Sequence, residues 1–500
     1  MIRRLAAVVL ALAVSGPALA DPVQVKVETG MLAGTRTGAV DVFRNIPFAA
    51  PPVGPLRWAP PAPAPAWSGV RDASQNGPSC PQIMHADGSP NGGGANGPMS
   101  EDCLQLNVFA PAGAKKAPVM VWIHGGSHRT GAGWVYDGTN FARDGVVLVS
   151  INYRLGPLGY FAHPALAGEA GPKGNYGLMD QIAALQWVKR NIAAFGGDPA
   201  KVTVFGESAG GMSTLAILAA PSTKGLYARA IVQSGGGWFP PTSLAAKAQA
   251  GAAATKAMGL PDDVTAAALR AVPADDLVNK LPGSDYGPFP DGTLLPLTAS
   301  QAFASGAAAD VPLIIGSNSG EDSLMGPKVA DPAAALARIP AFAQSPYADQ
   351  PDDETRLRAM FTDRYMGAPA RWTAAQAASG QPAWLYHFSY VGSRFRPALT
   401  RAFHAAEIQY VFEYWGRRTP MSVVSDEDRA MATLMHSCWV AFAKTGVPAC
   451  ASGPAWPAYD PKVDQLMEFG NGNGVRTHFQ KPRLDVQEKV GLPTLGLPAR

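Results

Sequence analysis

Residues 202–213 read VTVFGESAGGMS and place a serine between glycines in the motif G-x-S-x-G. The preceding VTVF has the apolar, β-branched character of a buried strand, and the following AGGMSTLAILAA can form a helix. A sharp strand-to-helix turn of this kind is a nucleophile elbow, which lifts the serine hydroxyl above the edge of a sheet. The positive end of the helix dipole points at the same place. The stretch therefore predicts Ser208 as a nucleophile.

The rest of the chain predicts an α/β domain around this turn. Apolar runs expected to be buried strands occur at 119–123, 146–152, 202–205 and 312–315, with later ones at 384–390 and 466–469. Apolar residues at helical spacing fill 179–195, so strands alternate with helices as in a mostly parallel, mixed sheet with crossovers. No repeat or linker divides the chain, which predicts one domain over 21–500. Helical insertions are expected around 240–280 and 329–380, as a cap over the carboxyl edge of the sheet.

A serine nucleophile needs a histidine base and an acid that orients it. Of the 8 histidines, His404 lies in a loop after the predicted strand 384–390. The chain order serine, acid, histidine places the acid between Ser208 and His404, after another strand. Glu321 and Asp322 both satisfy this condition, since they follow the strand at 312–315.

The predicted oxyanion hole has two parts. The backbone N–H of Ala209, directly after the nucleophile, is one donor. Gly125, Gly126 and Ser127 follow the strand at 119–123 in a turn similar to the HGGG type, and we expect them to surround the oxyanion. Glycine in such a turn allows the backbone to approach a substrate closely.

The first 20 residues have the three parts of a secretory signal peptide. A charged start with Arg3 and Arg4, an apolar run and the A-x-A site ending at Ala20 predict export and cleavage, to the periplasm or the medium. Removal of the two arginines lowers the formal net charge of +3 by two. Such a nearly neutral chain, without a basic cluster, gives no reason to expect nucleic acid or a membrane as a partner. No zinc-type spacing such as H-E-x-x-H occurs, and we expect neither a metal nor a cofactor.

The chain has 4 cysteines, an even number that suggests disulfides in an exported protein. The simplest pairing joins sequence neighbours, Cys80 with Cys103 and Cys438 with Cys450.

Several longer stretches resemble the type-B carboxylesterases, the branch of the α/β-hydrolases that includes the cholinesterases and bacterial para-nitrobenzyl esterases. They are FRNIPFAAPPVGPLRW (43–58), SEDCLQLNV (100–108), WIHGG (122–126), INYRLGPLG (151–159), GNYGLMDQIAALQWVKRNIAAFGGDP (174–199), FGESAGG (205–211) and FHAAEIQYVF (403–412). The resemblance implies an α/β-hydrolase fold and carries the catalytic roles to Ser208, His404 and Glu321, because glutamate is the characteristic acid of this branch.

The resemblance also implies structural pairs and neighbours of the triad. It implies a Cys80–Cys103 disulfide and ion pairs of Arg44 with Glu101 and of Arg154 with Asp180. It further places Glu207 and Ser234 near the triad. A structural role in hydrogen bonding is at least as well supported for them as a direct catalytic role.

The chain departs from the family pattern after Gly126. Relatives usually have a third glycine and then an aromatic residue, whereas this chain has Ser127, His128 and Arg129. His128 and Arg129 are therefore expected at the substrate gorge. One hypothesis is that Arg129 pairs with anionic substrates, and the alternative is a solvated or structurally paired arginine. Trp238 and Phe239 are candidates for the acyl pocket, although such residues are more often core.

Taken together, these features predict hydrolysis of small-molecule carboxylic esters through an acyl-enzyme intermediate. An amidase, a lactonase or a carbamate hydrolase with the same triad is the first alternative, because leaving-group preference depends on the shape of the gorge. A non-catalytic binding or adhesion member of the superfamily is the second, and the intact triad argues against it.

Overall fold

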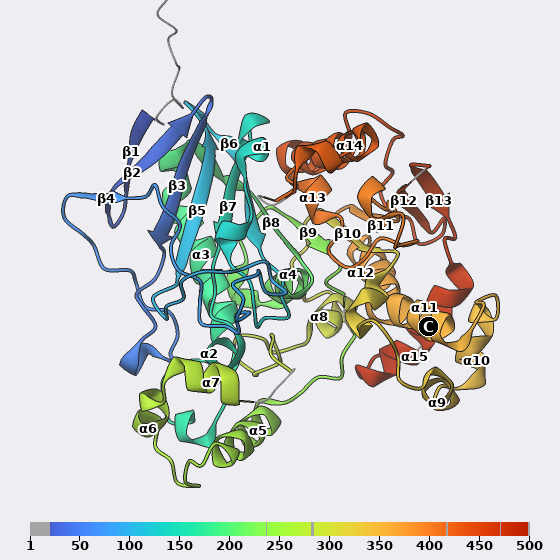
Figure 1. The fold of residues 1–500 in the computed structure, drawn as a ribbon, viewed down its shortest axis with the longest axis horizontal. Coiled ribbons are helices and arrows are strands. Elements are labelled where there is room, and N and C mark those ends of the chain that lie inside the picture. Colours follow the sequence, from blue (N-terminus) through green and yellow to red (C-terminus); the bar gives the residue numbers. More distant parts are fainter. Residues whose placement is uncertain (1–20, 237, 282–284, 417–418, 471, 499–500) are drawn as a thin grey trace, which may run out of the picture.

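The computed structural model describes residues 21–498 except 237, 282–284, 417–418 and 471, so the predicted signal peptide lies outside the described residues. One 13-stranded sheet runs through the described chain in the order β1-β2-β3-β5-β7-β6-β8-β9-β10-β11-β12-β13, with β4 paired to β2 (Figure 1). The strands are β1 Asp21–Val27, β2 Gly30–Thr37, β3 Val40–Pro47, β4 Val70–Asp72, β5 Gln105–Pro111, β6 Ala117–Ile123, β7 Val147–Ile151, β8 Gly197–Glu207, β9 Arg229–Gln233, β10 Leu313–Asn318, β11 Ala383–Phe388, β12 Gln465–Phe469 and β13 Gly474–Thr477.

The centre of the sheet, from β7 to β12, is parallel, and the outer pairs β1–β2, β2–β3, β3–β5, β5–β7 and β12–β13 are antiparallel. Residues in β7, β10 and β11 are buried throughout, because helices cover both faces of the sheet. All six strands expected from the sequence are present within these elements. The α/β-hydrolase fold class is confirmed.

The helices are α1 Thr139–Arg143, α2 Gly156–Gly159, α3 Tyr176–Asn191, α4 Ala209–Ala219, α5 Leu244–Ala257, α6 Ala266–Ala271, α7 Ala274–Lys280, α8 Ala299–Ser305, α9 Pro332–Ala337, α10 Ala341–Gln344, α11 Asp353–Thr362, α12 Ala368–Ala377, α13 Ile408–Val411, α14 Asp426–Thr445 and α15 Lys481–Thr494. One core cluster joins the sheet to α3, α4, α8, α12 and α15, and a second joins it to α1, α13 and α14. The helices α5, α6 and α7 lie together beyond the end of the sheet, and α9, α10, α11 and α15 gather beside it (Figure 1).

Two disulfides are formed, Cys80–Cys103 and Cys438–Cys450, and no described cysteine is free. Arg154 and Asp180 form the ion pair that the family resemblance implied, with Nη2 and Oδ1 2.7 Å apart. None of the described helices is long and apolar enough to cross a membrane.

The resemblance also implied an ion pair of Arg44 with Glu101. In the structure, Glu101 pairs with Arg57. Both guanidinium nitrogens Nε and Nη2 of Arg57 donate to the carboxylate of Glu101. Arg57 also donates to the carbonyl of Val272, at 2.5 Å, directly after α6. The guanidinium of Arg44 lies over the ring of Phe109 and donates to Oδ1 of Asn76, at 3.2 Å.

Candidate active site

Ser208 occupies the turn between β8 and α4 with φ 55° and ψ −122°, a strained conformation for a residue with a side chain. Its backbone N–H donates to the carbonyl of Gln233 at 2.8 Å. The flanking glycines are required by close packing, since a Cβ on Gly210 would lie 2.0 Å from the carbonyl oxygen of Ile123. A Cβ on Gly206 would lie 2.5 Å from the carbonyl of Gly210. The turn therefore has the geometry of a nucleophile elbow.

Two loops bring the predicted base and acid together. Gly320 donates its N–H to the carbonyl of Ala402 at 2.7 Å and thereby aligns the loop after β10 with the loop after β11. At this junction Nδ1 of His404 lies 2.5 Å from Oε2 of Glu321. The other oxygen of Glu321 accepts from the hydroxyl of Ser234, at 2.6 Å, and from the N–H of Asn318, at 2.6 Å. Glu321 is fully buried, and these donors hold its carboxylate toward the imidazole.

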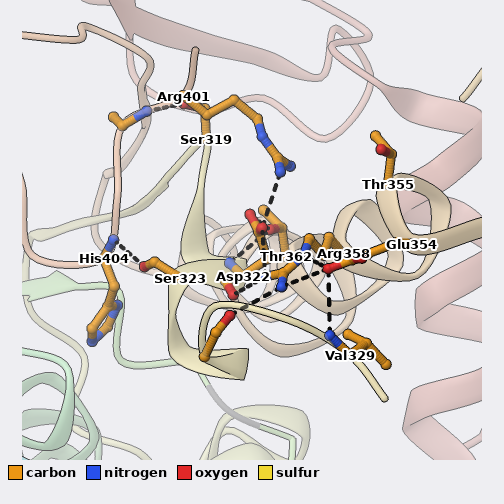
Figure 2. Close-up of polar contacts among 12 residues, drawn as sticks. Ser319, Asp322, Ser323, Val329, Glu354, Thr355, Arg358, Thr362, Arg401 and His404 are labelled. Atoms are coloured by element: carbon orange, nitrogen blue, oxygen red, sulfur yellow. Dashed lines mark hydrogen bonds and ion pairs between the residues drawn. The ribbon is translucent and has the colours of Figure 1, made fainter. Parts of the chain in front are cut away.

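Asp322, the alternative acid, faces the other way. Its Oδ2 lies 2.9 Å from Nη2 of Arg401 and 3.5 Å from Nη1 of Arg358. Figure 2 shows these contacts and the imidazole of His404 turned away from them, while the backbone N–H of His404 donates to Ser323. Of the two candidate acids, only Glu321 therefore contacts the imidazole of His404.

The second nitrogen of His404 faces another carboxylate. Nε2 lies 3.1 Å from Oε1 of Glu207, the residue before the nucleophile, and no hydrogen bond joins it to Ser208 within the described residues. Burial acts to lower the pKa of His404, but the carboxylates of Glu207 and Glu321 outweigh this effect and raise it above 6.5. Burial also raises the pKa of Glu207 to about 8, against the influence of His404.

A further buried carboxylate, which the sequence did not suggest, lies behind this pair. Glu407 accepts from the side-chain amides of Asn318, at 2.6 Å, and Gln233, at 3.0 Å. Burial raises the pKa of Glu407. The charge of its carboxylate in turn raises the pKa of His404 and that of Glu207. These amides come from the ends of β9 and β10, so only the sheet brings the cluster together.

The loop after β6 approaches the elbow from the other side. Gly126, Ser127 and His128 all have positive φ, at 104°, 56° and 54°. A Cβ on Gly125 would lie 2.7 Å from Oε2 of Glu207 and 3.1 Å from Cβ of Ser208. The N–H groups of Gly126, Ser127 and Ala209 find no acceptor among the described residues, as donors of an oxyanion hole require.

A cavity of about 510 Å³ opens above the nucleophile. Its wall is largely apolar and includes Ser127, His128, Ser208, Ala209, Met212, Leu215, Phe239, Phe289, Leu295, Phe303, Leu324 and Met366. Such a volume and lining suit a small organic substrate.

Of the four expected pocket residues, His128 and Phe239 line the cavity, and Trp238 and Arg129 do not. Phe239 lines the cavity, but Trp238 is core, because its ring packs at 6.0 Å against Trp372 with an edge-to-face angle of 82°. His128 is 1% exposed, and its Nε2 lies within hydrogen-bond distance of Oγ of Ser213. Arg129 lies over Tyr286, outside this lining, so the hypothesis of anionic selection has no support from its position.

One group of described residues has the spacing of metal ligands, namely Asp144, Glu413 and His436. Arg143 already pairs with both carboxylates, each at 2.7 Å. These residues are also absent from the cavity wall, and the catalytic geometry does not involve them.

Comparisons with known proteins show the family of the chain. The model of the Carboxylesterase family matches residues 21–342 and 335–487. The chain belongs to the carboxylesterase family. It is 37% identical to the para-nitrobenzyl esterase of Bacillus subtilis, over 89% of this chain and 94% of that protein. It is 36% identical to the fumonisin B1 esterase of Sphingopyxis macrogoltabida, over 91% and 88% of the two chains.

Solved structures of carboxylesterases have the same fold. A carboxylesterase of Geobacillus stearothermophilus superposes with a TM-score of 0.81 at 35% identity, covering 92% of this chain and 99% of that chain. A para-nitrobenzyl esterase structure gives a TM-score of 0.79 at 34% identity, with the same coverage. This carboxylesterase is therefore a carboxylic ester hydrolase.

Proposed function

We propose that this carboxylesterase is an exported serine hydrolase that cleaves esters of small molecules through an acyl-enzyme, with Ser208, His404 and Glu321 as its triad. The observation that carries the proposal is the Glu321–His404 contact of 2.5 Å beside the strained elbow that presents Ser208. Histidine held by a buried carboxylate is the arrangement that activates a serine hydroxyl.

In the first half of the reaction, Oγ of Ser208 attacks the ester carbonyl carbon while Nε2 of His404 takes the hydroxyl proton. The carbonyl oxygen becomes the oxyanion and accepts hydrogen bonds from the backbone N–H groups of the loop and of Ala209. The imidazolium then gives its proton to the alkoxy oxygen, the C–O bond breaks, and the alcohol leaves. A water molecule repeats the sequence on the acyl-enzyme and releases the acid.

Hydrolysis of para-nitrophenyl acetate, butyrate and octanoate tests the proposal. We expect activity that Ser208→Ala abolishes and that Ser379→Ala, at an exposed serine, leaves unchanged. A fluorophosphonate probe should add its mass to wild type and Ser379→Ala but not to Ser208→Ala. Labelling of the Ser208→Ala protein, or its full activity, would refute the triad.

Two matched comparisons address the remaining parts of the proposal. A para-nitrophenyl ester should be cleaved much faster than the para-nitroanilide of the same acid, and the reverse order would favour an amidase. Export predicts that the full-length chain, expressed in a bacterium, yields a mature protein starting at Asp21 outside the cytoplasm. An intact N-terminus in the cytoplasmic fraction would contradict export.

A further inference from the structure

The loop of the oxyanion hole is held in a conformation that its own sequence does not favour. Three consecutive residues, Gly126, Ser127 and His128, have φ between 54° and 104°. Two of them carry side chains, and a left-handed conformation costs about 1–3 kcal/mol for each such residue. The conformation persists only if surrounding contacts determine it.

His128 makes these contacts with both its backbone and its side chain. Its carbonyl accepts from the N–H of Gly156 at 2.6 Å. Its imidazole is buried, packs 5.0 Å from the ring of Tyr160, and places Nε2 2.9 Å from Oγ of Ser213. A Cβ on Gly287 would lie 2.9 Å from Nδ1, so the space around the ring is filled on that side too.

Ser213 belongs to the helix that carries the other half of the oxyanion hole. It lies in α4, one turn after Ala209, and is fully buried. Its oxygen also accepts from Nε2 of Gln181 in α3, at 3.1 Å. The His128–Ser213 hydrogen bond therefore joins the loop that holds Ser127 to the helix that holds Ala209.

We propose that the hydrogen bond between His128 and Ser213 is a clamp that sets the separation of the two sets of oxyanion donors, which makes His128 a positioning residue. This inference rests on the oxyanion hole of the proposed function. Burial lowers the pKa of His128 to about 3, so its imidazole is neutral in the working range and transfers no proton. The alternative role of the ring is simple filling of space, for which an aromatic residue would serve equally well.

Four variants separate these roles. His128→Phe keeps a ring and removes the hydrogen bond, Ser213→Ala removes the bond from the other side, and the double variant combines them. His163→Phe is the matched control, because that buried histidine also bonds to a hydroxyl, Oγ1 of Thr255 at 3.1 Å, outside the cavity wall. Steady-state kinetics with para-nitrophenyl butyrate give kcat and KM for each protein.

The clamp predicts that His128→Phe and Ser213→Ala each lower kcat roughly 10- to 100-fold, while KM changes less than about twofold. The double variant should fall no further than either single variant, because both remove the same bond. Inhibition by a trifluoromethyl alkyl ketone, which forms a tetrahedral adduct on the serine, should weaken by the same factor. Binding of the corresponding alcohol, which forms no oxyanion, should be unchanged.

The proposal is overturned if His128→Phe or Ser213→Ala keeps the wild-type kcat, if the two losses multiply, or if His163→Phe shows the same loss. Ser213→Ala suffices for the test should His128→Phe not fold. Failure of the clamp is distinct from failure of the triad. If only the clamp is wrong, Ser208→Ala still abolishes the activity of the enzyme.

Discussion

Replacing Glu207 by glutamine should move the pH dependence of activity to lower pH. The Oε1 atom of Glu207 lies 3.1 Å from Nε2 of His404, and its negative charge stabilises the imidazolium. The triad needs the neutral imidazole, so kcat/KM should rise as pH increases through the pKa of His404 in the free enzyme. In wild type this midpoint should lie above 6.5, the ordinary value for histidine.

Coulomb's law at 3.1 Å sets the size of the shift. The attraction amounts to about 1.3 kcal/mol with the dielectric constant of water and to about 5 kcal/mol with an effective value near 20. Since 1.36 kcal/mol corresponds to one pH unit, the midpoint should fall by between about one and four units in Glu207→Gln. Glutamine keeps the size and polarity of the side chain and removes only the charge.

Profiles of kcat/KM against pH, with para-nitrophenyl butyrate as substrate, measure this shift. Glu407→Gln is the graded control, because Glu407 raises the pKa of His404 less than Glu207 and Glu321 do. We expect its midpoint to move in the same direction by a smaller amount. A Glu207→Gln midpoint within about 0.3 units of wild type would refute this electrostatic reasoning.

Three further changes test the support of the site. Ser234→Ala removes the 2.6 Å hydrogen bond to Glu321. It should lower kcat about tenfold, which corresponds to a loss of about 1.4 kcal/mol of transition-state stabilisation. An unchanged kcat would show that the bond does not orient the acid. Gly125→Ala places a methyl group 2.7 Å from Oε2 of Glu207 and should lower kcat by about 100-fold or more, while Gly92→Ala, with open space around it, should behave as wild type. Serine in place of Cys438 and its partner opens a disulfide with a sequence separation of 12 and should lower the free energy of unfolding by about 3 kcal/mol in urea titrations, so equal stability would contradict a structural role.

Short-range patterns in the sequence predicted the frame of the fold. The buried strand before Ser208, the helix after it and the glycines around it are local features, and the structure reproduces them as β8, the elbow and α4. The parallel pairing at the centre of the sheet follows from the same patterns, because strands that alternate with helices pair in parallel through crossovers. The family motifs extended this reading to Glu321 and His404.

Side-chain direction was not readable from local sequence. Glu321 and Asp322 are neighbours at the end of the same strand, and the turn that begins there sends one toward His404 and the other toward Arg401. His128 stands where relatives often have an aromatic residue, and only the tertiary structure shows that it lines the cavity while its imidazole contacts Ser213.

The sequence by itself determined which residues can react, because nucleophile, base and acid depend on residue type and on position after a strand. The tertiary structure alone decided their partners. Glu101 pairs with Arg57 in place of Arg44, and Glu407 bonds to Gln233 across 174 positions of the chain. Contacts of this kind depend on how separate loops meet at the edge of the sheet, and that geometry results from packing of the whole domain.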